Sequence, residues 1–278
     1  MPFATSDGAR IHYHVSGPSS GEAVILIMGL GWDMTGWEGM LPHLRDYRVI
    51  RLDNRGAGRS DAPDEPYSIS GMAADVVAVM EGAQVESAHV YGASLGGMIA
   101  QELALRHPAR VRSLVLGCTS PGILSIPGHP AVLWLMLNRE RLPRDEALRR
   151  APPYLFHRSH ENDPAVQEVM RQRLLMPMNP VGYRRQRAAV ARWTSLRRLR
   201  SLRVPTLVLH GDRDRLIPEF NGRLLAALIP GARYHRLRNA GHVYSVDAPD
   251  EAAAAVVDFL SEQRGPSRVP MRRRARAH

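Results

Sequence analysis

The stretch HVYGASLGGMIAQ, residues 89–101, joins a short apolar run to a helical pattern through a serine crowded by glycines. Gly92, Gly96 and Gly97 lie within three residues of Ser94, and such a density indicates a sharp turn at which side chains would clash. G-x-S-x-G between a strand and a helix is the nucleophile elbow, which lifts the serine hydroxyl out of the sheet. The positive end of the following helix would point at this hydroxyl. Ser94 is therefore the candidate nucleophile.

Short apolar runs alternate with longer amphipathic segments on both sides of this stretch. The runs that predict strands are 9–15, 23–29, 47–53, 88–92, 113–118, 205–211 and 233–237. The segments that predict helices are 69–82, 95–107, 219–228 and 248–263. Strands that alternate with helices predict an α/β fold, with a mostly parallel sheet and helices on both faces. The first runs are expected to form an antiparallel edge.

One long segment, residues 122–199, breaks this alternation and predicts helices separated by prolines. We interpret it as a helical cap inserted into the α/β core, which would comprise residues 1–121 and 200–263. Residues 264–278 contain six arginines and almost no apolar side chains, a composition typical of a disordered tail. The candidate residues of the substrate pocket are Trp32, Trp37, Trp134 and Met136.

Composition narrows the possible classes of protein. The chain has 278 residues, of which 44% are hydrophobic, enough for one large domain with a core. Its net charge is +10, but every basic residue apart from histidine is arginine and part of the excess lies in residues 264–278, so we expect no nucleic-acid partner. A single cysteine, Cys118, rules out an intrachain disulfide and favours a cytoplasmic location. No signal peptide or membrane span is predicted.

Several motifs together resemble the α/β-hydrolase superfamily, in its branch with a helical cap. They are MGLG (28–31), LDNRGAGRSD (52–61), GASLGG (92–97), HGDRDRLIP (210–218) and NAGHVYSVDAPD (239–250). The resemblance extends from residue 5 to about residue 262. Within the second motif, Asp53 and Arg55 are expected to brace a turn.

The resemblance implies a catalytic triad, because this fold places its partners in the order Ser…Asp…His. A serine hydroxyl is a poor nucleophile until a base takes its proton, and the base needs an acid to orient it. His242 is the candidate base and Asp214 the candidate acid. The neighbouring Asp212 is the alternative, although it is expected to hydrogen-bond its own loop.

The resemblance also implies an oxyanion hole formed by the backbone N–H groups of Leu95 and Leu30. Met28-Gly29 stands where similar sequences commonly have His-Gly, and methionine cannot donate the side-chain hydrogen bond of that histidine. How the loop is braced is therefore open. The Met-Gly variant resembles methylesterase-like and enol-lactonase-like proteins.

These residues predict a serine hydrolase that cleaves an ester, thioester or lactone of a mid-sized, mostly apolar small molecule. No metal or cofactor is implied, and we expect a monomer or a homodimer. Three alternatives stay open: a cyclase or acyltransferase of natural-product biosynthesis, a C–C hydrolase or perhydrolase with the same triad, and a receptor that binds without turnover.

Overall fold

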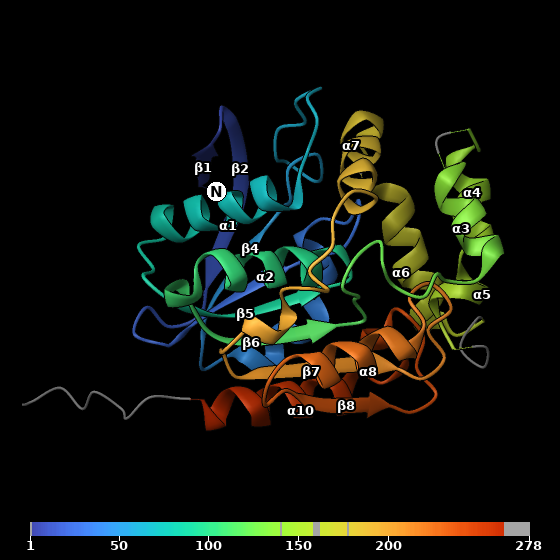
Figure 1. Ribbon diagram of the computed structural model, residues 1–278. Helices are drawn as coiled ribbons and strands as arrows, with labels where there is room; N and C mark the ends of the chain where they lie inside the picture. Colours follow the sequence, from blue (N-terminus) through green and yellow to red (C-terminus); the bar gives the residue numbers. More distant parts are fainter. Residues whose placement is uncertain (1, 140, 158–161, 177, 264–278) are drawn as a thin grey trace, which may run out of the picture.

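The computed structural model describes residues 2–139, 141–157, 162–176 and 178–263 (Figure 1). Its centre is an eight-stranded sheet in the order β1-β2-β4-β3-β5-β6-β7-β8. The strands are β1 (Phe3–Ser6), β2 (Ala9–Ser16), β3 (Ala23–Ile27), β4 (Arg48–Leu52), β5 (Ala88–Ala93), β6 (Val111–Gly117), β7 (Thr206–Gly211) and β8 (Arg233–Leu237). The predicted fold class is confirmed.

Strand pairing follows the predicted pattern. β1, β2 and β4 pair antiparallel at one edge, and β4, β3, β5, β6, β7 and β8 pair in parallel. β1 was not predicted, since only two of its four residues are buried and it carries no apolar run. Parallel pairing brings the carboxyl ends of the central strands to one edge, where α/β sheets bind their ligands.

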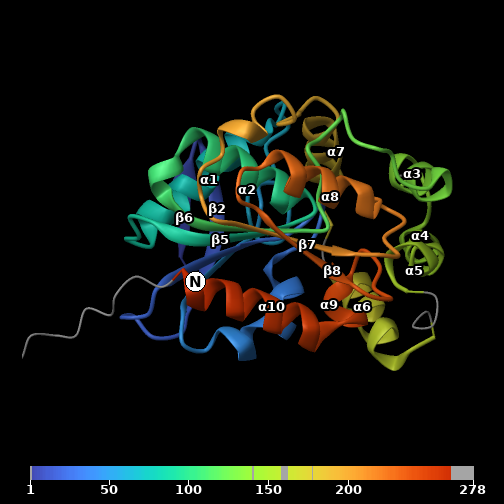
Figure 2. The same ribbon diagram turned by 60° about the horizontal axis from the view of Figure 1, so that its bottom comes forward.

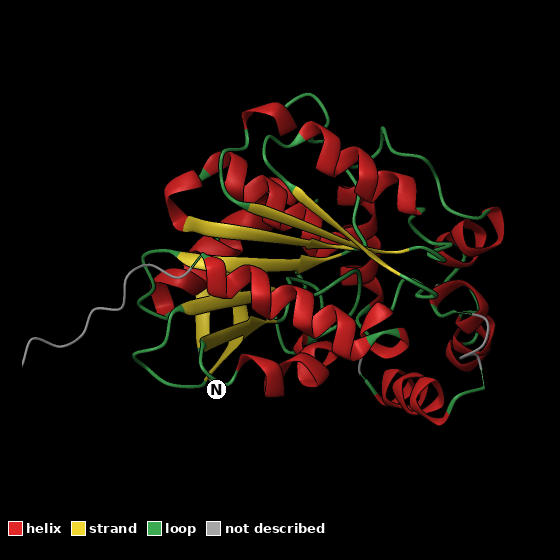
Figure 3. Ribbon diagram, turned by 90° about the horizontal axis from the view of Figure 1, so that it is seen from below, coloured by secondary structure: helices red, strands yellow, loops and turns green. Residues whose placement is uncertain are grey.

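Helices cover both faces of the sheet, as Figures 2 and 3 show. The helices of the first face are α1 (Ile69–Gly82), α2 (Leu95–Arg106) and α8 (Glu219–Leu228). Those of the second face are the 3-10 helix η1 (Met34–Leu44) and α10 (Pro249–Glu262). Successive strand residues point to opposite faces, so Val90 packs into the first core and Tyr91 into the second. Both layers of helices are therefore anchored on the same strands.

Between β6 and β7, where the sequence predicted helices, the described residues form five α-helices, followed by the 3-10 helix η4 (Leu199–Ser201). The five α-helices are α3 (Pro130–Leu137), α4 (Arg144–Arg150), α5 (Pro152–Leu155), α6 (Pro164–Leu175) and α7 (Pro180–Val190). Figures 1 and 3 show them beyond the carboxyl ends of the central strands. Several hydrogen bonds tie them to loops of the core: for example, Gly31 N donates to Gln186 Oε1 at 2.8 Å, and Val243 N donates to the Leu155 carbonyl at 2.9 Å.

The turn after β4 is braced by buried charges, as predicted. Asp53 accepts hydrogen bonds from Met34 N at 2.8 Å and Arg59 N at 3.0 Å. Arg55 forms a buried ion pair with Asp75 of α1, with an Nε–Oδ2 distance of 2.6 Å. The pair connects the turn with α1. Removal of one partner would leave the other charge buried without compensation, which strongly destabilises a fold.

Two further expectations concern the outside of the molecule. Within the described part of the chain, no helix is both long and apolar enough to cross a lipid bilayer. The predicted tail, residues 264–278, lies outside the described residues.

The contact between α2 and β3 leads to a test of the fold. A Cβ on Gly96 would lie 2.0 Å from the carbonyl oxygen of Ile27, and backbone cannot move aside cheaply. Gly96→Ala should therefore lower the free energy of unfolding by about 3 kcal/mol or more. Gly39→Ala is the control, because nothing lies within 4 Å of its Cβ, and its effect should stay within about 0.5 kcal/mol. Urea unfolding measures both; equal stability of the two variants would contradict this account.

Candidate active site

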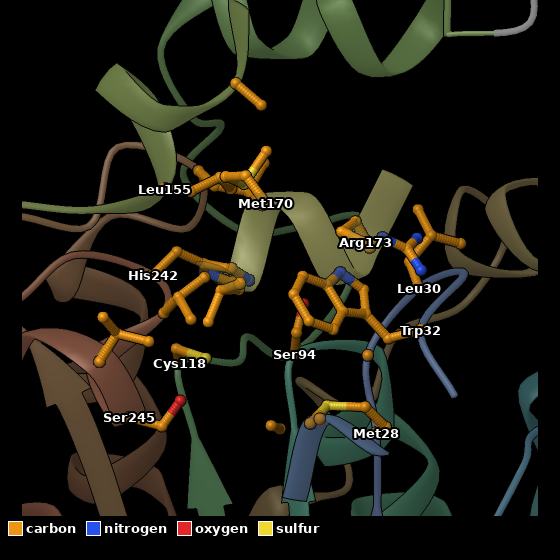
Figure 4. A pocket seen from close by; sticks show the side chains of 18 of the residues that line it. Met28, Leu30, Trp32, Ser94, Cys118, Leu155, Met170, Arg173, His242 and Ser245 are labelled. Atoms are coloured by element: carbon orange, nitrogen blue, oxygen red, sulfur yellow. The ribbon is translucent and has the colours of Figure 1, made fainter. Parts of the chain in front are cut away.

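Ser94 lies between β5 and α2, in a turn that the backbone holds under strain. Its φ of 55° is in the left-handed region, which costs a residue with a side chain roughly 1–3 kcal/mol. Ser94 N donates to the Gly117 carbonyl at 2.9 Å, and the Ser94 carbonyl accepts from Thr119 Oγ1 at 2.7 Å. These contacts with the end of β6 fix the turn, so the Ser94 side chain reaches the cavity beyond the strand ends (Figure 4).

His242 and Asp214 meet beside this cavity, although 28 residues separate them in sequence. His242 Nδ1 lies 2.8 Å from Asp214 Oδ2. Since this contact uses Nδ1, Nε2 is the ring nitrogen left for a proton from another group. Among the described residues, the Ser94 hydroxyl and His242 share no hydrogen bond; without substrate such bonds are often long.

The Asp214 carboxylate is buried and held on several sides. Its Oδ1 accepts from the backbone N–H groups of Leu216 at 2.9 Å and Ile217 at 2.8 Å. Its Oδ2 also lies 3.4 Å from His210 Nε2. Asp212 instead faces Arg236, at 3.5 Å. The structure thus brings Asp214, and not Asp212, against His242.

The charges of this pair favour each other. Burial alone would raise the pKa of Asp214, but the charge of His242 and hydrogen bonds from His210 and His242 lower it to about 2. Burial alone would lower the pKa of His242, but the Asp214 carboxylate and the neighbouring Cys118 raise it well above 6.5. Asp214 is therefore ionised at neutral pH and stabilises a proton on the imidazole.

The loop after β3, which carries the predicted oxyanion donor Leu30, lies next to Ser94. A Cβ on Gly29 would lie 3.2 Å from the Ser94 Cβ. Within the described residues, neither Leu30 N nor Leu95 N has a protein acceptor. The sequence left open how this loop is braced. In the structure its backbone is held by a side chain: the Met28 carbonyl accepts a hydrogen bond from Asn54 Nδ2 at 2.8 Å. The missing histidine is thus not needed to hold the loop.

A cavity of about 430 Å³ opens above these residues and is mostly apolar. Trp32, Trp37 and Met136, three of the four predicted pocket residues, line it together with Ser94 and His242. Figure 4 shows Trp32, Ser94 and His242 around this cavity. Trp134, the fourth, does not: it is half exposed and lines a separate hollow with Pro153 and Tyr154. On α3, Trp134 and Met136 are two residues apart and point about 200° apart, so one helix face could not present both.

Among the lining residues that the sequence did not predict are two that carry groups with chemistry of their own. Cys118, directly after β6, is buried in the core beneath the site, lines the cavity and contacts His242. Arg173, on the inserted helix α6, lines the cavity and contacts Trp32 of the core. No sequence motif marks either residue; the end of a central parallel strand was the one signal available for Cys118.

Cys118, Asp214 and His242 are also the described side chains that could share a metal ion. One ligand atom from each lies within 4.8 Å of the other two. A thiolate, a carboxylate and an imidazole are a donor set that zinc accepts. The hydrogen bond between His242 and Asp214 already explains why these two groups are close.

Comparisons with known proteins agree with this architecture. A model of the alpha/beta hydrolase fold family matches residues 22–249. A poly(3-hydroxyalkanoate) depolymerase of Ectopseudomonas oleovorans is 34% identical over 79% of this chain and 77% of the relative. A putative carbamate hydrolase RutD of Variovorax paradoxus (strain S110) is 31% identical over 92% of this chain and 98% of the relative.

A solved structure extends the likeness to three dimensions. The enol-lactonase from Burkholderia xenovorans LB400 superposes with a TM-score of 0.83 at 31% identity, covering 94% of this chain and all of that one. The chain therefore belongs to the α/β-hydrolase-fold family. It is a hydrolase.

The histidine–aspartate contact makes a prediction that does not depend on catalysis. The His242 imidazole should titrate well above pH 6.5, because Asp214 stabilises its charged form. Asp214→Asn should lower this pKa, whereas Asp212→Asn should leave it within about 0.3 units, since Asp212 does not contact the ring. Titration of His242 by NMR in the three proteins measures the shift. An equal shift in both variants would contradict the assignment of Asp214.

Proposed function

We propose that the protein is a serine hydrolase which cleaves esters or lactones through an acyl-enzyme on Ser94. The observation that carries the proposal is a strained serine that shares a cavity with a histidine whose Nδ1 lies 2.8 Å from a buried carboxylate. Nucleophile, base and orienting acid are the three parts that acyl transfer needs.

Each residue has one role in this mechanism. Ser94 Oγ attacks the carbonyl carbon while His242 Nε2 takes the hydroxyl proton, and Asp214 stabilises the imidazolium that forms. The N–H groups of Leu30 and Leu95 receive the developing oxyanion. His242 then returns the proton to the leaving oxygen, and water, activated by the same histidine, releases the acid and restores Ser94.

The cavity suggests the size and polarity of the substrate. Its volume of about 430 Å³ suits a small molecule, and its apolar lining favours a mostly apolar acyl or alcohol group. We propose that the inserted helices act as a cap over this site, because α6 and α3 contribute part of the cavity lining. The names of the relatives support hydrolysis in general: they describe a depolymerase, a carbamate hydrolase and an enol-lactonase.

Labelling with a fluorophosphonate tests the nucleophile directly. The wild-type protein should be labelled, and Ser94→Ala and His242→Ala should not, because the probe needs an activated hydroxyl. Ser245→Ala, which removes another serine of the same cavity, should remain labelled. In parallel, short-chain 4-nitrophenyl esters and a lactone should be turned over by wild type and lose about 10³-fold or more in kcat with Ser94→Ala.

The outcomes separate the proposal from its alternatives. Labelling without release of acid from any ester or lactone would favour a cyclase or acyltransferase, in which water is not the acceptor, or a C–C hydrolase, in which water cleaves a carbon–carbon bond instead. Absence of labelling in the wild type would contradict the proposed nucleophile.

The pH dependence of turnover tests the base. Only the neutral imidazole can take the Ser94 proton, so kcat/KM should rise with pH through the pKa of His242, above 6.5. Asp214→Asn should lower kcat by roughly 10³–10⁴-fold and move this limb to lower pH, since the carboxylate no longer stabilises the charged ring. Rate profiles between pH 5 and 9 measure both effects, and an acid limb below 6.5 in the wild type would contradict this role.

A further inference from the structure

We propose that Arg173 forms an anion subsite in the cavity, and that the substrate is an ester or lactone which also carries an ionised carboxylate. The proposal rests on the proposed hydrolysis at Ser94 and narrows its substrate class. It starts from a contrast: the cavity is mostly apolar, yet a guanidinium group is part of its wall.

Arg173 is nearly buried, which is costly for a charge. Only 9% of the residue is exposed. Its guanidinium carbon lies 4.7 Å from the centre of the Trp32 ring, a cation–π contact on the wall of the cavity (Figure 4). Arginine is seldom buried to this extent unless its guanidinium is held by partners in the protein, as that of Arg173 is.

The way in which Arg173 is held suits the binding of an anion. The guanidinium carbon lies over the Trp32 ring, and the N–H donors lie in the plane of the guanidinium and point outward from its edges. Nη1 lies 3.8 Å from the Met176 sulfur, which is a weak acceptor. A fork of five donors can bind a carboxylate with two parallel hydrogen bonds while other edges keep other contacts.

The charges around the cavity favour a negative ligand. Apart from His242, the charged side chains among its described lining residues are Arg139, Arg173 and Glu38. Glu38 is 62% exposed and pairs with Arg51 at 2.6 Å, so its charge is largely screened by solvent and by this partner. A positive charge in an apolar, low-dielectric wall interacts with a ligand in the cavity more strongly than the same charge would in water.

The oxyanion loop connects this subsite with the reacting serine. A Cβ on Gly29 would lie 3.2 Å from the Ser94 Cβ, and a Cβ on Gly31 would lie 3.3 Å from Arg173 Nη2. The two contacts are thus made by Gly29 and Gly31, which are separated in the loop by one residue. A small substrate can place its carbonyl at Ser94 and its carboxylate at Arg173 at the same time.

Matched substrates test the subsite. Mono-4-nitrophenyl adipate carries a carboxylate on the acyl side, and 4-nitrophenyl hexanoate is its neutral counterpart; 4-(butyryloxy)benzoate and phenyl butyrate form the same pair on the alcohol side. The wild type should prefer the carboxylate member of at least one pair. Arg173→Met should lower that preference, measured as a ratio of kcat/KM values, by about 10- to 100-fold and mainly through KM. Arg173→Lys should retain part of it.

Arg171 provides the matched control on the same helix. It is exposed and paired with Glu168 at 2.7 Å, outside the cavity lining. Arg171→Met should therefore leave the preference of the wild type in place. An equal loss for charged and neutral substrates in Arg173→Met would show a structural role only and would overturn the subsite. A wild type without preference in either pair would overturn it without any variant.

A second measurement separates this proposal from the proposed function. Protection of Ser94 from the fluorophosphonate probe requires binding but no turnover. Monomethyl adipate should protect the wild type at about tenfold lower concentration than methyl hexanoate, and Arg173→Met should remove this difference. If esters are not hydrolysed but this difference is found, the proposed hydrolysis fails and the subsite stands. If esters are hydrolysed without any such difference, the subsite fails alone.

Discussion

The first turn of α2 lies directly on the carbonyl of Ile27 at the end of β3, and the active site depends on this contact. Gly96 allows it, since a Cβ there would lie 2.0 Å from that oxygen. The loop with Gly29 and Leu30 continues from β3, so the same approach that seats the helix carries this loop to Ser94. One backbone contact thereby places the nucleophile next to a proposed oxyanion donor.

Glycines also set how the inserted helices meet the core. A Cβ on Gly56 would lie 2.6 Å from the Cα of Gly182 in α7, and a Cβ on Gly241 would lie 2.6 Å from the carbonyl oxygen of Leu155, the last residue of α5. Gly31 is hydrogen-bonded through its N–H to Gln186. The inserted helices therefore contact loops of the core near Ser94 and His242. The wall of the cavity is formed by residues of the core and of the inserted helices together.

Two buried charged groups, the Asp214–His242 pair and Arg173, belong to this site. The Asp214 carboxylate keeps its charge although it is buried, because His242 and two backbone N–H groups compensate it, and it raises the pKa of the imidazole. Arg173 keeps its charge by stacking on Trp32 at the other side of the site. The first group suits proton transfer, and the second suits the recognition of a negative group.

The sequence by itself determined the sheet, most of its helices, and Ser94, because periodic burial and a glycine-rich turn are local properties of the chain. It also indicated Asp214 and His242, through motifs at the ends of predicted strands. Only the tertiary structure decided that Asp214 rather than Asp212 meets His242, that Trp134 lies outside the cavity, and that Cys118 and Arg173 line it. These choices depend on where the inserted helices and loops pack, and contacts between segments far apart in sequence leave no local pattern to detect.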